Sequence, residues 1–401
     1  MKMRSLLYIL LFAATLLFSC SKDPVTPANR LDCATFDNPD FKTNPKSDQY
    51  QALIDDYVKK GLPGVILLIK DDNGFYVGSS GMADIDKGIK MQPCHVSKIA
   101  SITKFMLGIT IFRLQEKGIL SIDDKVSKYI DADILNKIEN GNEDLRIRNL
   151  MNHTSGIYDV IKDQGFYLQI LNNPSKQWNP MQLLEYVYGK PATFAFNPED
   201  TAAYSNTNFT LLAMIVEKAT GKSQSQVMHE ELIDPLGLND TYYFYHDALP
   251  EGQIAQGYYD LYNNGTLMNL SNWNTGSGNG YGGAYSTVWD MYLIMHALFE
   301  SNTLLSQESM DQMFTFHKTI ESRKHLGLAC FKDFIDIGTE NDYAIGHRGR
   351  DLSYSADLFY FPNHHATMSM IVNYGTDGES DLRPVFKEMR DKIAEVIISE
   401  N

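Results

Sequence analysis

Ser101 and Lys104 stand three residues apart in the stretch IASITKFMLG, and an apolar run follows Lys104. Side chains at this spacing share one face of a helix, so the hydroxyl and the amine should be neighbours. A serine hydroxyl becomes a good nucleophile only when a nearby group removes its proton. Burial lowers the pKa of a lysine, and the neutral amine can then accept that proton. The pair therefore has the composition of an activated serine.

The pattern S-x-x-K has little specificity by itself. It occurs a second time at Ser19 and Lys22, at the end of an apolar N-terminal segment, where it has no catalytic use. A serine that caps a helix, followed by a lysine that extends to solvent, would have the same spacing. Other motifs must decide between a nucleophile and a helix cap.

Two further motifs follow along the chain. Tyr204-Ser205-Asn206 precedes the apolar helical run FTLLAMIVEKATG, and Gly346-His347-Arg348-Gly349 is followed by the strand-like run LSYSADLFYFP. The same patterns recur at Tyr262-Asn263-Asn264, in an Asn/Gly-rich loop, and at His325-Leu326-Gly327. We expect these second matches to be structural.

The three motifs together resemble those of the serine β-lactamase / penicillin-binding protein superfamily, specifically its class C β-lactamase-related branch, which includes DD-carboxypeptidases and esterases. Segments between the motifs are similar too. They are GLPGVILLI (61–69), GILSIDDKVSKYI (118–130), LMNHTSGI (150–157), IDPLGLNDT (233–241) and GYGGAYSTVWDM (280–291). The resemblance covers about 50–395, nearly the whole mature chain.

The resemblance implies that Ser101 attacks a carbonyl carbon and forms an acyl-enzyme. Lys104 and Tyr204 would transfer the serine proton, with tyrosinate character at Tyr204 favoured by the nearby ammonium. Asn206 would hydrogen-bond Lys104 and the substrate amide. His347 would line the opposite wall and hydrogen-bond Tyr204 or the leaving group.

The resemblance also places substrate contacts near the third motif. Backbone N–H groups of Ser101 and Arg350 would form the oxyanion hole, and Gly349 would let the substrate approach the backbone. No cofactor is implied. His364 and His365 have no third ligand at a suitable spacing, so we expect no metal site.

Arg348 and Arg350 depart from the small residues or threonine that the family often has here. The two-residue period of a strand puts them on one side. A guanidinium matches a carboxylate bidentately, so they would recognise the free carboxylate of a D-alanyl peptide or of a β-lactam. The alternative is that they pair with Asp351, Asp342 or Glu340.

Histidine at 347 bears on the substrate. A class C β-lactamase would be expected to have K-T-G, and no K-[ST]-G occurs in the chain. The H-x-G version resembles DD-carboxypeptidases, D-aminopeptidases and several esterases, and the missing G-x-S-x-G excludes an α/β-hydrolase. FNPED (196–200) stands where relatives have Pro-Gly, which leaves the loop before Tyr204 undefined.

We therefore expect a serine hydrolase of small amides or esters, first of all one with a D-alanyl-D-alanine carboxypeptidase-like activity on cell-wall peptides. Its partners would be a small-molecule or peptide substrate, with peptidoglycan as a candidate. The alternatives are an esterase or weak β-lactamase on the same scaffold, or a non-catalytic binding protein.

Strand-like runs lie at both ends of the mature chain, with helical patterns between them. We expect a hairpin around Asp72-Asn73-Gly74 and strands at 326–335, 342–347, 353–361 and 366–374. Helices are expected at 51–61, 101–117, 143–152, 181–188, 207–219, 224–235, 287–300, 306–315 and 382–398. The helix at 101–117 has two apolar stripes and should be buried on most sides.

This order of elements predicts an α+β fold of the β-lactamase/transpeptidase-like type. An antiparallel sheet flanked by helices would come from 49–100 and 283–398, and a mainly helical lobe at 101–282 would be inserted into it. Together they form a catalytic domain at 49–398, with the active site in the cleft between the lobes.

The N-terminus has the layout of an export signal. Lys2 and Arg4 precede an apolar stretch, and LFSC resembles the lipobox of bacterial lipoproteins, whose cysteine is lipidated. We expect a lipoprotein-type signal peptide at 1–19, a lipid anchor at Cys20, and a tether at 20–48. The protein would then be exported and attached to a membrane of the cell envelope. The alternative is an ordinary cleaved signal with an incidental cysteine.

Charge and cysteine content narrow the classes further. The chain has 35 Lys and Arg against 50 Asp and Glu, a net charge of −15, which argues against a nucleic-acid partner. Cys33, Cys94 and Cys330 are an odd number, so at least one should stay free or pair between chains.

Overall fold

The computed structural model describes residues 32–142, 144–196, 201–319, 324–335, 337–339 and 341–399. The expected signal peptide at 1–19, the lipidation site Cys20 and the first part of the tether lie outside these residues. No helix in the described part is both long and apolar enough to cross a bilayer.

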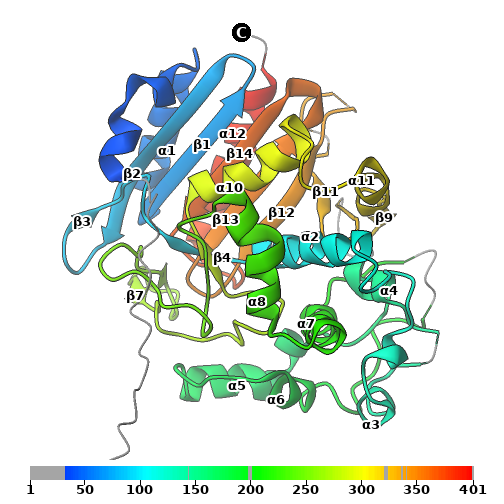
Figure 1. Cartoon of the computed structure of the whole chain (residues 1–401). Helices are drawn as coiled ribbons and strands as arrows, with labels where there is room; N and C mark the ends of the chain where they lie inside the picture. Colours follow the sequence, from blue (N-terminus) through cyan, green and yellow to red (C-terminus); the bar gives the residue numbers. More distant parts are fainter. Residues whose placement is uncertain are drawn as a thin grey trace, which may run out of the picture.

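A nine-stranded antiparallel sheet forms the centre of the molecule (Figure 1). The N-terminal hairpin lies beside strands from the end of the chain, as expected. The strands, in spatial order, are β3 (Ile89–Lys90), β2 (Gly74–Asp84), β1 (Gly64–Asp71), β14 (Ala366–Val372), β13 (Ser355–Phe361), β12 (Ala344–Arg350), β11 (Phe331–Asp333), β10 (His325–Leu326) and β9 (His317–Lys318).

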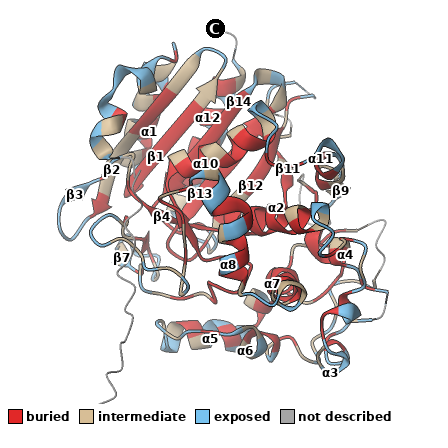
Figure 2. Ribbon diagram, viewed as in Figure 1, coloured by how far each residue is buried: buried red, intermediate tan, exposed pale blue. Residues whose placement is uncertain are grey.

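Helices cover both faces of this sheet. On one face, α1 (Ser47–Lys59) and α12 (Leu382–Ile398) pack on Val65 and Leu67; on the other, α2 (Ile102–Glu116) and α10 (Val288–Met295) pack on Ile66 and Leu68. This alternation is the two-residue period of a strand buried on both faces. Helix α2 is buried almost all round, as its two apolar stripes predicted (Figure 2).

A mainly helical region lies between α2 and α10 in the sequence. Its helices are α3 (Ala132–Leu135), α4 (Ile147–Met151), α5 (Gln164–Asn172), α6 (Pro180–Leu184), α7 (Asn206–Thr220), α8 (Gln224–Met228) and α9 (Asp234–Leu236), and α11 (Gln307–Met313) follows later. Short 3-10 or π turns are η1 (Cys33–Asp37), η2 (Pro39–Lys42), η3 (Val126–Lys128), η4 (Val160–Lys162), η5 (His229–Ile233), η6 (His296–Glu300) and η7 (Pro362–His364). Helix α2, which we assigned to the helical lobe, packs against β12 and β13 of the sheet and also against α7, α8 and η5 of the helical region.

Two small sheets were not expected. One joins β4 (Ser97–Ala100), β8 (Ala284–Ser286) and β5 (Tyr242–Tyr243), and the other pairs β6 (Tyr258–Tyr259) with β7 (Met268–Asn269). The first has functional importance, because β4 leads directly to Ser101. Strands of two to four residues are too short to show a period in the sequence.

Three expectations need correction. The run 326–335 is not one strand, because a turn in which Ala329 has φ +63° separates β10 from β11. The tether does not extend to residue 48, since η1 and η2 pack on the domain and Phe36 is buried against Trp289. Cys33 forms a disulfide with Cys94, and Cys330 stays free and buried.

Candidate active site

Ser101 stands at the junction of β4 and α2. The preceding residue, Ala100, has φ +48°, a left-handed conformation that is uncommon for a residue with a side chain. The Thr103 hydroxyl donates to the Ala100 carbonyl at 2.6 Å and accepts a hydrogen bond from Ala284 of β8. This turn presents Ser101 to the cleft at the first turn of the helix, where the helix dipole favours negative charge.

Lys104 lies one turn further along α2 and is fully buried. Its Nζ is 2.9 Å from Ser101 Oγ, 2.7 Å from Asn206 Oδ1 and 2.6 Å from the Tyr281 carbonyl oxygen. Burial lowers the pKa of Lys104 to about 7, against the opposing effect of Asp159. A substantial fraction of the lysine is therefore neutral near pH 7.

The three neighbours of Lys104 determine where its lone pair points. The Asn206 amide oxygen and the Tyr281 carbonyl can only accept, so the two protons of a neutral amine are used there. Ser101 is the neighbour that can donate. The lone pair of neutral Lys104 is thus directed at the Ser101 hydroxyl proton, which is the arrangement a general base needs.

Asp159 was not predicted from the sequence. It lies before η4, is buried, and accepts hydrogen bonds from the backbone N–H and the side-chain Nδ2 of Asn206. Burial raises its pKa, while the Asn206 hydrogen bonds oppose that shift. A single Asp in the run GIYDVI gives no periodic or motif signal, so only the folded chain reveals it.

Tyr204 completes the group around the nucleophile. Its ring lies 4.9 Å from Lys104 Nζ, and its hydroxyl is hydrogen-bonded with Ser101. Burial raises the pKa of Tyr204, and the bond with Ser101 only partly offsets this. The expected tyrosinate character is therefore wrong, because the phenol keeps its proton at neutral pH.

His153 supports Tyr204 from behind. The two ring centroids are 4.5 Å apart with the planes tilted by 30°, and the backbone N–H of Ser205 donates to His153 Nδ1 at 3.1 Å. A nitrogen that accepts cannot carry a proton, so this imidazole is neutral, in agreement with a pKa lowered by burial and by Lys104. His153 thus fixes the position of the tyrosine ring.

His347 lies on β12 and is buried. Its Nδ1 is 2.7 Å from the Arg348 carbonyl, which can only accept, so the proton is on Nδ1 and Nε2 is left as an acceptor. Burial lowers its pKa far below the usual value, and Lys104 adds to this. Its ring centroid is 6.3 Å from that of Tyr204, and the described residues show no hydrogen bond between the two.

Gly349 has a different neighbour from the one expected. A side chain there would overlap the carbonyl oxygen of Ile99, so the glycine allows β12 to pack directly on β4. The position that a side chain of residue 349 would take is therefore occupied by the strand that leads to Ser101, and a substrate cannot use it. Strand β11 pairs only with Ala344–Gly346, so the following edge of β12 has no sheet partner on that side in the described structure.

The two arginines of β12 have separate environments. Arg350 forms a bidentate pair with Asp357 of β13, at 2.9 and 3.0 Å, a partner that we had not considered. Arg348 forms no ion pair with any described residue, and its guanidinium lies 5.1 Å from the centre of the Phe331 ring. Burial, then Arg350, lowers the pKa of Arg348 to about 10, so it remains charged at neutral pH.

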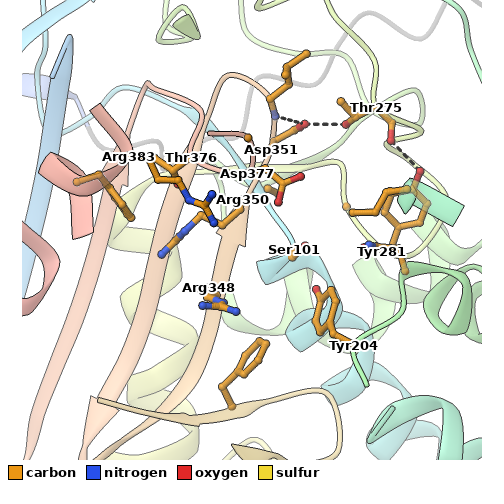
Figure 3. A pocket seen from close by; sticks show the side chains of 18 of the residues that line it. Ser101, Tyr204, Thr275, Tyr281, Arg348, Arg350, Asp351, Thr376, Asp377 and Arg383 are labelled. Carbon is orange, nitrogen blue, oxygen red and sulfur yellow. Dashed lines mark hydrogen bonds between the residues drawn. The ribbon is translucent and has the colours of Figure 1, made fainter. Parts of the chain in front are cut away.

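A cleft of about 860 Å³ joins these groups (Figure 3). Ser101 lies in the middle of it in this view, with Arg348 on the left and Thr275, Tyr281 and Tyr204 on the right. Asp351 also lines the cleft and forms an ion pair with buried Lys98, with 2.8 Å between Nζ and Oδ2. The described residues contain no group of His, Cys, Asp and Glu that could hold a metal ion.

The comparison with known proteins decides the family. The model of the family described as "Beta-lactamase" matches residues 50–386. The chain belongs to the Beta-lactamase family. It has the β-lactamase/transpeptidase-like fold of this family, whose members are serine hydrolases.

Two curated proteins show what this Beta-lactamase family protein is similar to in sequence. Penicillin-binding protein 4* of Bacillus subtilis (strain 168) is 24% identical over 79% of this chain and 69% of its own length. Protein flp of Staphylococcus aureus (strain MW2) is 30% identical over 54% of this chain. That match spans 43% of protein flp, less than half of the relative's length.

Solved structures share the fold of this Beta-lactamase family member. The D-stereospecific amidohydrolase of Streptomyces sp. matches with a TM-score of 0.73 and 24% identity, covering 86% of this chain and 98% of its own. The D-amino acid amidase of Ochrobactrum anthropi SV3, complexed with L-phenylalanine amide, matches with a TM-score of 0.74 and 22% identity, covering 87% and 97%.

Proposed function

We propose that this protein forms an acyl-enzyme on Ser101 and removes the C-terminal residue of D-alanyl-D-alanine peptides, a DD-carboxypeptidase-like activity of the class C-related branch. Arg348 is the observation that carries this choice. It is a charged, largely buried guanidinium at the catalytic cleft that pairs with no carboxylate among the described residues, and a free C-terminal carboxylate would supply such a partner. Relatives named as a penicillin-binding protein and D-specific amidases support this substrate class.

The geometry supports a sequence of proton transfers. Neutral Lys104 takes the proton of Ser101 while Oγ bonds to the carbonyl carbon. The C–N bond then breaks, and the leaving nitrogen takes the proton of Tyr204, which the Lys104 ammonium replaces. Water hydrolyses the resulting ester by the same groups in reverse. The backbone N–H groups of Ser101 and Arg350 would stabilise the oxyanion.

Labelling tests the nucleophile. A fluorophosphonate or a labelled penicillin should modify the wild type and leave Ser101→Ala unmodified. Equal labelling of the two proteins would refute the assignment of Ser101. No labelling of the correctly folded wild type, together with no turnover, would favour the non-catalytic binding protein.

Substrate pairs test the role of Arg348. The wild type should hydrolyse a D-Ala-D-Ala peptide with a free carboxylate about 10- to 100-fold faster, in kcat/KM, than its C-terminal amide. Arg348→Met should abolish that preference, and Lys387→Met, which removes an exposed cation from the same cleft, should keep it. Equal rates for acid and amide, with fast turnover of short-chain esters or of a β-lactam, would favour the esterase or β-lactamase alternative.

Export and a lipid anchor at Cys20 also belong to this proposal. The N-terminal sequence motivates it, and the Cys33–Cys94 disulfide supports it because such bonds persist in oxidising compartments. Wild-type protein expressed with its N-terminus should incorporate labelled palmitate and fractionate with membranes, and Cys20→Ser should do neither. A wild type that takes up no labelled palmitate and is recovered in the soluble fraction would indicate an ordinary cleaved signal.

A further inference from the structure

Asp377, in the loop between β14 and α12, is a carboxylate of the cleft that the catalytic scheme does not use (Figure 3). Asp159 and Asp351 line the same cleft, but both have partners, an amide and a lysine respectively. Within the described structure, Asp377 accepts no hydrogen bond and forms no ion pair. Its side chain remains open to solvent and therefore to a ligand.

The loop holds Asp377 in place from both sides. The hydroxyl of Thr376 is 2.7 Å from that of Ser355, and the Tyr259 hydroxyl donates to the Glu379 carbonyl at 2.9 Å. These contacts fix the backbone before any substrate arrives, which lowers the entropic cost of binding. A carboxylate fixed in this way is pre-organised for a cation.

No cation of the described structure is paired with Asp377, so its carboxylate can bind a cation of the substrate. Arg383 is already bound to Glu379 through a hydrogen-bonded ion pair. The nearby cleft walls partly desolvate Asp377, and Asp351 and Asp159 repel its charge, which together raise its pKa to about 6 although its side chain still reaches solvent. The groups that face Asp377 are Lys104 of α2, Asp159 before η4, Tyr167 of α5, Tyr204 before α7, Arg348 of β12, Asp351 after β12 and Arg383 of α12.

We propose that Asp377 binds an ammonium group on the acyl part of the substrate. The substrate would then be a short D-peptide whose acylating residue has a free amino group, such as a D-dipeptide. An α-ammonium is two bonds from the carbonyl carbon that Ser101 attacks, and Asp377 lines the cleft into which Ser101 opens. This inference rests on the proposed function and adds the opposite end of the substrate, since Arg348 would bind the carboxylate and Asp377 the ammonium.

Acetylation of the substrate tests the proposal. The wild type should hydrolyse D-alanyl-D-alanine with a kcat/KM about 10- to 100-fold above that of N-acetyl-D-alanyl-D-alanine. Asp377→Asn should reduce this ratio to near one. The matched control Asp381→Asn removes an exposed carboxylate four residues away, leaves the Arg383–Glu379 pair intact, and should keep the wild-type ratio.

The pH dependence gives a second readout. The preference for the free amine should appear as pH rises through about 6, where Asp377 ionises, and fade above about 8, where an α-ammonium loses its proton. Asp377→Asn should remove the lower limb of this profile. Equal rates for the two dipeptides in the wild type, or an unchanged ratio in Asp377→Asn, would overturn the proposal.

A binding measurement separates this inference from the proposed function. D-alaninamide should protect Ser101 from a fluorophosphonate about tenfold better than N-acetyl-D-alaninamide, whether or not either is hydrolysed. Equal protection would overturn the role of Asp377. Failure of the wild type to react with the fluorophosphonate would instead refute the proposed function itself.

Discussion

Asp159 holds the side-chain amide of Asn206 in one orientation. Nδ2 of Asn206 lies 3.1 Å and 3.3 Å from the two carboxylate oxygens, and its backbone N–H donates to the same group at 2.9 Å. An ionised carboxylate only accepts, so the amide oxygen must point away from it, toward Lys104. By orienting Asn206, Asp159 thus determines that the Asn206 amide oxygen accepts a hydrogen bond from Lys104.

Asp159→Asn should therefore impair proton transfer. The new amide can also donate, which removes the reason for the Asn206 orientation, and the lost negative charge lowers the pKa of Lys104 below about 7. We expect kcat/KM to fall roughly 10- to 100-fold and the acid limb of its pH profile to move to lower pH. Asp163→Asn, which removes a nearby helix-capping carboxylate paired with Lys190, should leave that limb in place. The prediction would be contradicted if the acid limb of the kcat/KM profile lay at the same pH in Asp159→Asn and in the wild type.

The protonation of Lys104 should be visible in the wild-type pH profile. With an uncharged ester as substrate, kcat/KM should rise with pH through about 7 and then level off, because the neutral amine is the active form. Lys104→Arg keeps a permanent charge and should lose about 10²- to 10⁴-fold. Lys98→Arg, at the other buried lysine, keeps a cation for Asp351 and should lose far less. An activity that stays constant from pH 5 to 9 would show that Lys104 is not the base.

Gly349→Ala should disturb the site without touching a reacting group. The added methyl group would overlap the Ile99 carbonyl oxygen and push β12 away from the strand that ends at Ser101. We expect a loss of about 1–3 kcal/mol in the free energy of unfolding and about tenfold in kcat. In Gly282→Ala the methyl group would be 3.8 Å from Ala100, an ordinary contact, so denaturation should show little change. If Gly349→Ala were as stable as the wild type, β12 and β4 could move apart at no cost, and the close packing at Gly349 would not be required.

His229 should make stability depend on pH. Its two ring nitrogens lie 2.9 Å from Asp234 and 3.0 Å from Asp247, and these partners, Asp247 first, raise its pKa to about 9. This contribution is complete below the unfolded pKa of about 6.5 and is lost as pH rises through about 9. Because the pair with Asp234 is solvent-exposed, we expect about 1 kcal/mol. From pH 6 to 9.5, the free energy of unfolding should fall by that much more in the wild type than in His229→Gln; parallel curves would contradict this.

The sequence was most informative where a motif and a long period coincided. The apolar stripes of 101–117 predicted a buried helix, and the spacing of Ser101 and Lys104 on it predicted neighbours, which the 2.9 Å contact confirms. The Y-x-N and H-x-G motifs pointed to the elements that face this helix. The antiparallel sheet made from both ends of the chain followed from strand-like runs with helices between them.

Other features depend on tertiary contacts that no local pattern contains. Whether Arg350 pairs with Asp351 or Asp357 is set by strand register, which pairs Arg350 with Ser355 and so brings Asp357, two residues further along β13, within reach of its guanidinium. The state of Tyr204 depends on burial, which outweighs the nearby cation that suggested tyrosinate character. Asp159 and Asp377 are single acidic residues in loops, where composition gives no sign of a cleft.

If Cys20 carries the proposed lipid anchor, the Cys33–Cys94 disulfide limits how far the domain can stand from the membrane. Thirteen residue steps separate Cys20 from Cys33, so even a fully extended chain spans only about 45 Å. Without the packed segment that the disulfide secures, the chain would be free as far as Ser47 and could span about 95 Å. A lipid-anchored form would therefore work within about one domain diameter of the bilayer and reach only substrates that come that close.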